Sequence, residues 1–209
     1  MAIRLHAITL ADAQHPGPGD AGGNGATMLV PFRELCAVVS EQKAFLLDET
    51  TPASIAEHQA VVDAVFQRAA VLPAPVGVVF RTPDVLKRWM ELHYVSLRDA
   101  LEFVEDRAVA RVHIARADGK GGELESDSEL AAAATESLRA IRRKAAASVP
   151  LRLESATGLL LSASYLVERD QWNDFLHAVG EQREAHHLLR FEITGPWAPY
   201  DFVRMQFGG

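Results

Sequence analysis

Histidine supplies most of the candidate chemistry in this sequence, which has eight histidines but only one cysteine. His177 and Glu181 are four residues apart, so on a helix they would share a face and could share a metal ion. His186 and His187 are adjacent and would point to opposite sides of a strand. The sequence has no His-Glu-x-x-His motif and no cysteine pair, which are the arrangements that zinc sites use. We therefore expect no metal site.

Nucleophilic and acid–base catalysis have equally little support. Cys36 lies in an apolar segment, where a thiol usually packs as a small hydrophobic group. No serine occupies a Gly-x-Ser-x-Gly elbow. His58 lies on the apolar face of a predicted helix, where a buried histidine with satisfied nitrogens is a better interpretation than a catalytic base. The glycine-rich run at 17–25 matches neither a phosphate loop nor a dinucleotide fingerprint. We expect no catalytic residue and no cofactor.

The composition is that of a folded, acidic protein. Of its 209 residues, 48% are hydrophobic and 23% are charged, and 21 Lys and Arg against 28 Asp and Glu give a net charge of −7. This balance argues against nucleic acid as a partner, because phosphate contacts require a basic face. The longest apolar runs, Val71–Phe80 and Gly158–Val167, are half the roughly 20 residues of a transmembrane helix. With no secretory signal and a single cysteine, we expect a cytoplasmic protein that does not bind membranes.

The hydrophobic pattern predicts strands alternating with helices. The predicted strands are Ile3–Leu10, Leu35–Ser40, Val71–Phe80, Val109–Ala115, Gly158–Val167, Leu188–Thr194 and Asp201–Phe207. Helices are predicted near residues 51–70, 82–106, 129–148 and 170–184. The expected inner face of the helix at 82–106 consists of Val85, Trp89, Leu92, Ser96, Ala100 and Val104.

The order of these elements predicts an α+β fold of two small domains. Residues 117–128 are rich in glycine and acidic side chains and contain nothing to bury, so they are the best candidate for a boundary. Two small sheets, each backed by helices, follow from the alternation of elements, and a ferredoxin-like arrangement is the simplest solution for each. We expect an N-terminal domain at 1–117, a linker with an Ala-rich helix at 118–150, and a C-terminal α+β domain with a βαβ pattern at 151–209.

The segment Thr194–Val203 forms a stiff corner that carries aromatic side chains. Gly195 can adopt a positive φ, and two prolines fix φ near −65°. Trp197, Tyr200 and Phe202 are large anchors that either lock the C-terminal sheet to the helices or face a partner. Packing is the favoured role from the residues alone. These three aromatics are nevertheless the candidate partner-binding residues.

That corner resembles a signature of the gas vesicle protein family GvpL/GvpF. The family's Gly-Pro-Trp-x-Pro-Tyr-x-Phe-Val pattern is matched by Gly195, Pro196, Trp197, Pro199, Tyr200, Phe202 and Val203. The segment Ala163–Arg169 is similar to the family's strand leading into a helix. His58, followed by Val71-Leu72-Pro73, is similar to its His-containing helix and Val-Leu-Pro. The resemblance spans most of the chain.

Two segments depart from the family pattern. After Val71-Leu72-Pro73 the family usually continues with an Arg-Phe-Gly-Thr-like run, whereas this chain has Ala74-Pro75-Val76-Gly77 and lacks the Arg and Thr. The region between Ala115 and Leu151 is shorter than usual and lacks a charged helix bearing Tyr and Arg. Contacts that those family features make are therefore not expected here.

The resemblance implies a non-enzymatic accessory protein of gas vesicle formation, with an N-terminal modified ferredoxin-like domain and a C-terminal α+β domain. It implies the hydrophobic shell protein GvpA and other accessory Gvp proteins as partners, and a place in the cytoplasm with the gas vesicles. A soluble acidic protein could hold such an aggregation-prone subunit by covering its apolar surface. One alternative is a minor structural component of the vesicle. Another is a small-molecule enzyme or sensor that uses His58, His113 and Tyr165.

Overall fold

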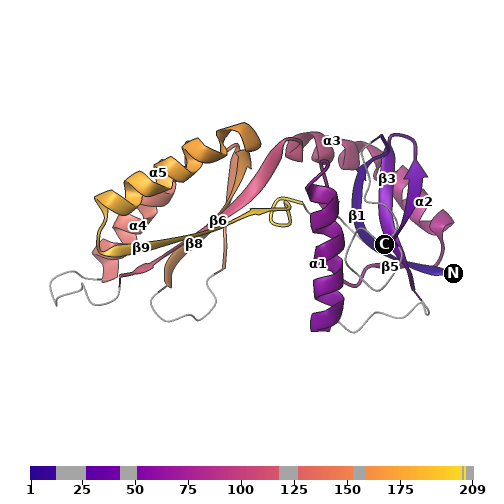
Figure 1. The fold of residues 1–209 in the computed structure, drawn as a ribbon, viewed down its shortest axis with the longest axis horizontal. Coiled ribbons are helices and arrows are strands. Elements are labelled where there is room, and N and C mark those ends of the chain that lie inside the picture. The colour runs from indigo at the N-terminus through magenta and orange to yellow at the C-terminus, as the bar shows by residue number, and fades with distance from the viewer. Residues whose placement is uncertain (13–26, 43–50, 118–126, 153–158, 204, 206–209) are drawn as a thin grey trace. The chain divides into compact units, whose positions relative to one another are not determined.

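The computed structural model describes residues 1–12, 27–42, 51–117, 127–152, 159–203 and 205. They form two compact units, and Figure 1 shows a sheet with helices in each. The first unit combines Met1–Glu105 with Ala198–Gly209, and the second consists of Asp106–Trp197. The chain thus leaves the first unit once and returns to it. The predicted α+β class with two small sheets is confirmed, and the structure shows that both sheets are antiparallel.

The sheet of the first unit is built around β1, which pairs on both edges. Its order is β2-β3-β1-β4, with β5 also pairing with β1, and all pairs are antiparallel. The strands are β1 (Ala2–Leu10), β2 (Thr27–Phe32), β3 (Leu35–Gln42), β4 (Leu72–Pro73) and β5 (Val79–Phe80). The single strand expected at Val71–Phe80 is two short pieces instead. Pro75, which lies between the two pieces, explains this break, because proline cannot donate a ladder hydrogen bond.

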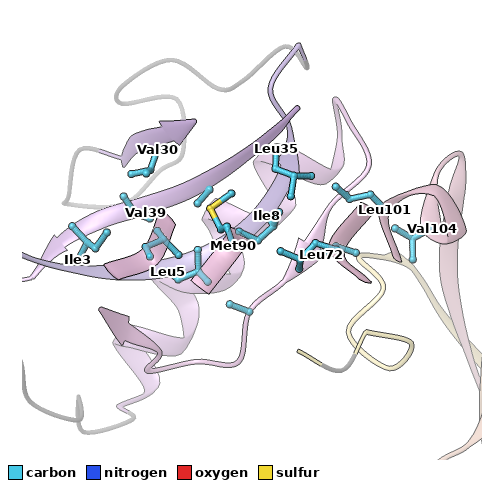
Figure 2. Packing of buried hydrophobic residues seen from close by; sticks show 14 residues of the cluster. Ile3, Leu5, Ile8, Val30, Leu35, Val39, Leu72, Met90, Leu101 and Val104 are labelled. Carbon is cyan, nitrogen blue, oxygen red and sulfur yellow. The ribbon is translucent and has the colours of Figure 1, made fainter. Parts of the chain in front are cut away.

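Three helices complete the first unit: α1 (Pro52–Phe66), α2 (Pro83–Leu92) and α3 (Tyr94–Val104). Helix α1 begins with a capping box in which Thr51 and Ser54 satisfy each other's backbone N–H groups. Between the sheet and α2 and α3 lies an apolar core, which Figure 2 shows from close by. Its labelled members are Ile3, Leu5, Ile8, Val30, Leu35, Val39, Leu72, Met90, Leu101 and Val104.

The helix expected at 82–106 is two helices that meet at His93, and its expected inner face is wrong at three positions. Val85, Leu92 and Ser96 are exposed. The side chains buried from these helices are Leu86, Met90, Leu97, Leu101 and Val104. Two apolar rows lie side by side on α2, so periodicity alone could not select the buried one. The break at His93 also changes which residues share a face, because the prediction applied helical spacing to one continuous helix.

The second unit has the β-α-β-β-α-β order of a ferredoxin-like fold. Its elements are β6 (Arg107–Arg116), α4 (Asp127–Arg142), β7 (Ala147–Pro150), β8 (Leu159–Glu168), the short 3₁₀ helix Arg169–Gln171, α5 (Trp172–Ala185) and β9 (Leu189–Trp197). The sheet order β7-β8-β6-β9 is antiparallel throughout. Apolar side chains of α4 and α5, including Ile141 and Phe175, pack with inward residues of the strands.

The limits of the two units differ from the domain ranges expected from the sequence. Strand β6 was expected within 1–117 and α4 within the linker at 118–150. Pairing of β6 with both β8 and β9 places them in the second unit. The strand expected at Asp201–Phe207 is wrong for its described part, since Asp201 and Phe202 lie in turns. Residues 204, 206 and 207 are outside the described residues.

Gly195 should resist substitution, because a side chain at this position would collide with the neighbouring strand. Its φ is +130°, and an added Cβ would lie 2.5 Å from the carbonyl oxygen of Val109 and 3.2 Å from Cη2 of Trp172. We expect Gly195→Ala to lower the free energy of unfolding by about 1–3 kcal/mol.

Gly180→Ala is the matched control, because this helical glycine has open space around it. The same chemical change should there raise stability by about 0.5–1 kcal/mol. Urea unfolding of both variants measures the difference. Equal effects at the two positions would contradict the steric argument.

Candidate partner-binding surface

Helices α2 and α3 present large apolar side chains to solvent. Leu92 is 83% exposed, Val95 is 68% exposed, and Val85 and Phe103 are each 42% exposed. Val85 and Leu92 are seven residues apart on α2, and Val95 and Phe103 are eight apart on α3, so each pair recurs on one side of its helix. Single exposed apolar residues are normal, whereas these four lie on two consecutive helices. We call these four residues the α2–α3 surface.

The same two helices line a groove of about 280 Å³. Its walls are Leu72, Trp89, His93, Ser96, Leu97, Ala100, Phe202, Val203 and Met205. The ring of Trp89 lies 5.0 Å from that of His93 and 5.8 Å from that of Phe80, measured between centroids. Seven of these nine lining residues are apolar, although polar atoms make up about half of the exposed lining, and Phe202, Val203 and Met205 come from the segment after β9.

The three aromatic residues predicted to bind a partner fall in different units. Trp197 is the last residue of β9 in the second unit, where it is 44% exposed and donates a hydrogen bond from Nε1 to Oγ1 of Thr194. Tyr200 and Phe202 are half-buried in the first unit. Of the three, Trp197 therefore offers the most side-chain surface to a partner.

Tyr200 lies beside a pair of buried histidines. Its ring centroid is 6.5 Å from that of His58, and His58 Nδ1 is 3.3 Å from Nδ1 of His6. His6 Nε2 lies 2.9 Å from Oγ of Ser40. Both imidazoles are fully buried, so His58 is the buried histidine that the sequence indicated. Within the described chain His58 Nε2 and the Tyr200 hydroxyl make no hydrogen bond.

Burial keeps both histidines neutral. It lowers the pKa of His6 to about 3, assisted by His58 and Arg4. Burial also lowers the pKa of His58, while the backbone of Ala74 opposes this shift and Arg4 adds to it. Two neutral imidazoles can share one proton between their facing nitrogens, one donating and the other accepting. The lowered pKa values make both imidazoles weak bases, and their contacts form a buried polar network.

The sequence did not reveal that His58 has a histidine neighbour. His6 lies at a bulge of β1, between Leu5 and Ala7, where the register with β3 shifts. The alternation in Ile3–Leu10 suggested a strand with one polar face. In the structure α1 packs on β1, so the polar side chains Arg4 and His6 are buried as well.

The other sequence candidates for chemistry are divided between the two units. His113 and Tyr165 are in the second unit and His58 is in the first. The register places His113 opposite Ser162 and Tyr165 opposite Ala110, on the two different faces of that sheet. Oγ of Ser162 lies 2.8 Å from Nδ1 of His113, whereas the Tyr165 hydroxyl donates to the carbonyl of Leu138.

Two further requirements concern the part of the chain that the structure describes, those of a metal site and those of a membrane-spanning helix. His177 Nδ1 lies 3.4 Å from a carboxylate oxygen of Glu181, on an exposed helix face. No cluster of three or more potential metal ligands occurs among the described residues. Nor does any helix there combine the length and apolar character that crossing a bilayer requires.

The geometry defines an α+β protein with two antiparallel sheets and exposed apolar side chains on α2 and α3. The sequence profile of "Gas vesicle synthesis protein GvpL/GvpF" matches residues 3–119 and 116–204. The chain therefore belongs to the GvpL/GvpF family of gas vesicle proteins, which confirms the resemblance seen in the sequence.

Relatives and solved structures agree with this assignment. The chain is 31% identical to gas vesicle protein F2 of Halobacterium salinarum, over 90% of this chain and 85% of the relative. It is 30% identical to gas vesicle protein F of Haloferax mediterranei, over 86% and 82%. The crystal structure of GvpF from Anabaena sp. PCC7120 has a TM-score of 0.75 at 14% identity and covers 99% of both chains. GvpF from Microcystis aeruginosa has a TM-score of 0.70, also at 14% identity, and covers 98% of this chain and 99% of its own.

Proposed function

We propose that this protein assists gas vesicle assembly by binding the hydrophobic shell protein GvpA through the α2–α3 surface. Membership of the family places the chain among proteins of gas vesicle formation. The direct partner, the binding mode and action without catalysis are our proposal. Other accessory Gvp proteins are the further expected partners, and the expected location is at gas vesicles in the cytoplasm.

The exposure of the α2–α3 surface is the observation that carries this proposal. Burying apolar area contributes roughly 25 cal/mol per Å², so exposed Leu92 and Val95 favour contact with another apolar surface. A partner helix or strand with an apolar face is the kind of segment that such a surface accepts. The net charge of −7 would keep the complex dispersed.

The predicted aromatic residues take different parts in this proposal. Trp197 is exposed and remains a candidate for direct contact with a partner. Tyr200 packs beside His58, and Phe202 lines the groove. We propose that Tyr200 and Phe202 act by shaping the first unit, which is the packing role that the sequence favoured.

Replacing Leu92 and Val95 tests the surface directly. In cells that co-express GvpA, we expect the double variant Leu92→Ser/Val95→Ser to recover GvpA in a pull-down at least about tenfold less well than the wild type, which corresponds to about 1.4 kcal/mol. Because both side chains are exposed, the melting temperature should change little.

Leu176→Ser is the matched control, because Leu176 is an exposed leucine on α5 in the second unit. It should leave GvpA recovery unchanged. A Trp197→Ala variant examines the other exposed anchor separately. Undiminished recovery of GvpA by a folded Leu92→Ser/Val95→Ser variant would exclude the α2–α3 surface from the interface.

A further inference from the structure

Helix α4 of the second unit ends in a cluster of exposed basic side chains, which we call the α4 basic patch. The patch consists of Arg139, Arg142, Arg143 and Lys144. Arg142 and Arg143 follow Arg139 by three and four residues, so the three guanidinium groups share one side of the helix. The chain keeps turning beyond α4, because the N–H of Arg143 donates to the Ala140 carbonyl and that of Lys144 to the Ile141 carbonyl. The basic side chains are therefore gathered at one end of α4.

The protein itself compensates little of the charge of this patch. Arg139 lies 4.0 Å from a carboxylate oxygen of Glu136, which is a long ion pair. The other three cations make no ion pair within the part of the chain that the structure describes. No Asp or Glu occurs in the sequence between Glu136 and Glu154. Across the sheet, Glu168 of β8 is already paired with Arg107, at 2.8 Å.

The end of the helix accounts for only part of this arrangement. Cations in the last turn interact favourably with the helix dipole, but like charges four residues apart, such as Arg139 and Arg143, oppose helix formation. On α2 the charges are mixed instead, since Lys87 and Arg88 each have a carboxylate four residues away. An uncompensated basic patch in a chain of net charge −7 therefore points to a negatively charged partner.

We propose that the α4 basic patch binds an acidic segment of another protein. Guanidinium groups hold carboxylates through paired, charge-assisted hydrogen bonds, and three of the four cations are arginines. Nucleic acid fits less well, because its binding draws on many phosphate contacts, about 6–10 in a typical case. Nor does any aromatic residue occur between Glu136 and Glu154 to stack on bases.

A membrane surface also fits less well than an acidic protein. The apolar residues of α4, including Leu130 and Ile141, are buried in the core of the second unit, so they cannot insert into lipid. The patch lies in the second unit and the α2–α3 surface in the first. The proposal therefore gives the second unit a partner of its own and does not rest on GvpA as a partner.

Binding of a fluorescein-labelled decaglutamate peptide to the full-length protein tests the patch. We expect Arg142→Glu/Arg143→Glu to bind the peptide at least about tenfold more weakly than the wild type in fluorescence anisotropy titrations. Arg142→Gln/Arg143→Gln removes the charges without reversing them and should bind about three- to fivefold more weakly. This variant decides the result if the glutamates disturb the fold, which circular dichroism shows.

Lys87→Glu/Arg88→Glu is the matched control, because it makes the same change in net charge in the first unit. It should bind the peptide like the wild type. An equal loss in the two charge-reversal variants would attribute binding to net charge and overturn the proposal. Equal affinity of the wild type and both patch variants would overturn it as well.

Two other anions separate the possible classes of partner. A thymidine decanucleotide and vesicles of phosphatidylserine and phosphatidylcholine are titrated under the same conditions, and both should bind more weakly than the peptide. If either bound more tightly than the peptide and lost affinity in Arg142→Glu/Arg143→Glu, the patch would belong to that class of partner instead. The proposal of an acidic protein segment would then be wrong.

Discussion

Truncating Leu86 to alanine should cost about 2–5 kcal/mol of unfolding free energy, whereas truncating Leu92 should cost less than about 0.5 kcal/mol. The two leucines lie on the same helix, six residues apart. Leu86 is fully buried in the core of the first unit, and Leu92 is almost fully exposed. Leu86→Ala removes packed methyl groups and leaves a cavity. Leu92→Ala removes atoms that contact mainly water.

Urea unfolding followed by circular dichroism measures both variants, and each serves as the control for the other. Met90→Ala provides a second buried position on the same face of α2 and should fall in the same range as Leu86→Ala. The ranking matters more than the magnitudes. If Leu92→Ala were the more damaging change, the row containing Val85 and Leu92 would be the buried one, and the α2–α3 surface would not exist.

The pair also shows why the hydrophobic pattern predicted helical structure here but the wrong buried face. Val85 and Leu92 make a helical row as regular as Leu86 and Met90, because α2 is apolar over a wide arc. Which row faces the sheet depends on how the helix packs, and that is a property of the tertiary structure. The break at His93 was the one feature of these helices that the local sequence could have indicated, because histidine and the β-branched Val95 form helices less readily than leucine or alanine.

The second unit was easier to predict. In β9, Leu189 and Phe191 alternate with exposed Arg190 and Glu192, as expected for a strand with one buried face. Its pairing with β6, far away in the sequence, was not visible, because strand order is set by contacts that no local pattern records. That missing information is why the expected domain ranges separated β6 from β9.

The candidate surface was only partly visible in the sequence. The aromatic corner was recognisable because Gly195 and the prolines restrict its backbone. The structure divides that corner between two units, with Trp197 in one and Tyr200 in the other. The exposed residues of the α2–α3 surface were expected to be buried or were not singled out. A functional apolar surface has the same composition as a core, so the sequence alone cannot separate the two.

The buried pair His6 and His58 should make the protein lose stability as the pH falls below about 6.5. The pKa of His6 is about 3 in the folded protein and about 6.5 when the chain unfolds. Between these values the unfolded state binds a proton that the folded state does not. The stability that comes from keeping His6 neutral in the folded protein is therefore fully present above the unfolded pKa, and it is lost on acidification. Its slope is about 1.4 kcal/mol per pH unit, and His58, whose pKa is also lowered, steepens it.

Charged neighbours set the size of this effect. Arg4 adds to the cost of protonating either imidazole, and Glu57 lies 3.7 Å from Arg4 and partly compensates its charge. Asp63 acts in the opposite direction. Burial raises the pKa of its carboxyl group, so the folded state gains a proton first as the solution becomes acidic. The histidine contribution is spread from about pH 6.5 toward pH 3 and dominates at the upper end of that window, where carboxyl groups are still ionised.

Replacing one histidine isolates its contribution from the general acid sensitivity of the chain. The His6→Gln variant keeps an amide that can face Ser40 but cannot titrate. From pH 7 to pH 4.5 we expect it to lose about 2–3 kcal/mol less unfolding free energy than the wild type, measured by urea unfolding at each pH. His177→Gln makes the same change at an exposed helix position, and its curve should follow the wild type. If the unfolding free energy of His6→Gln fell with pH in parallel with that of the wild type, the argument would be contradicted, because His6 would then be protonated in the folded state without loss of stability.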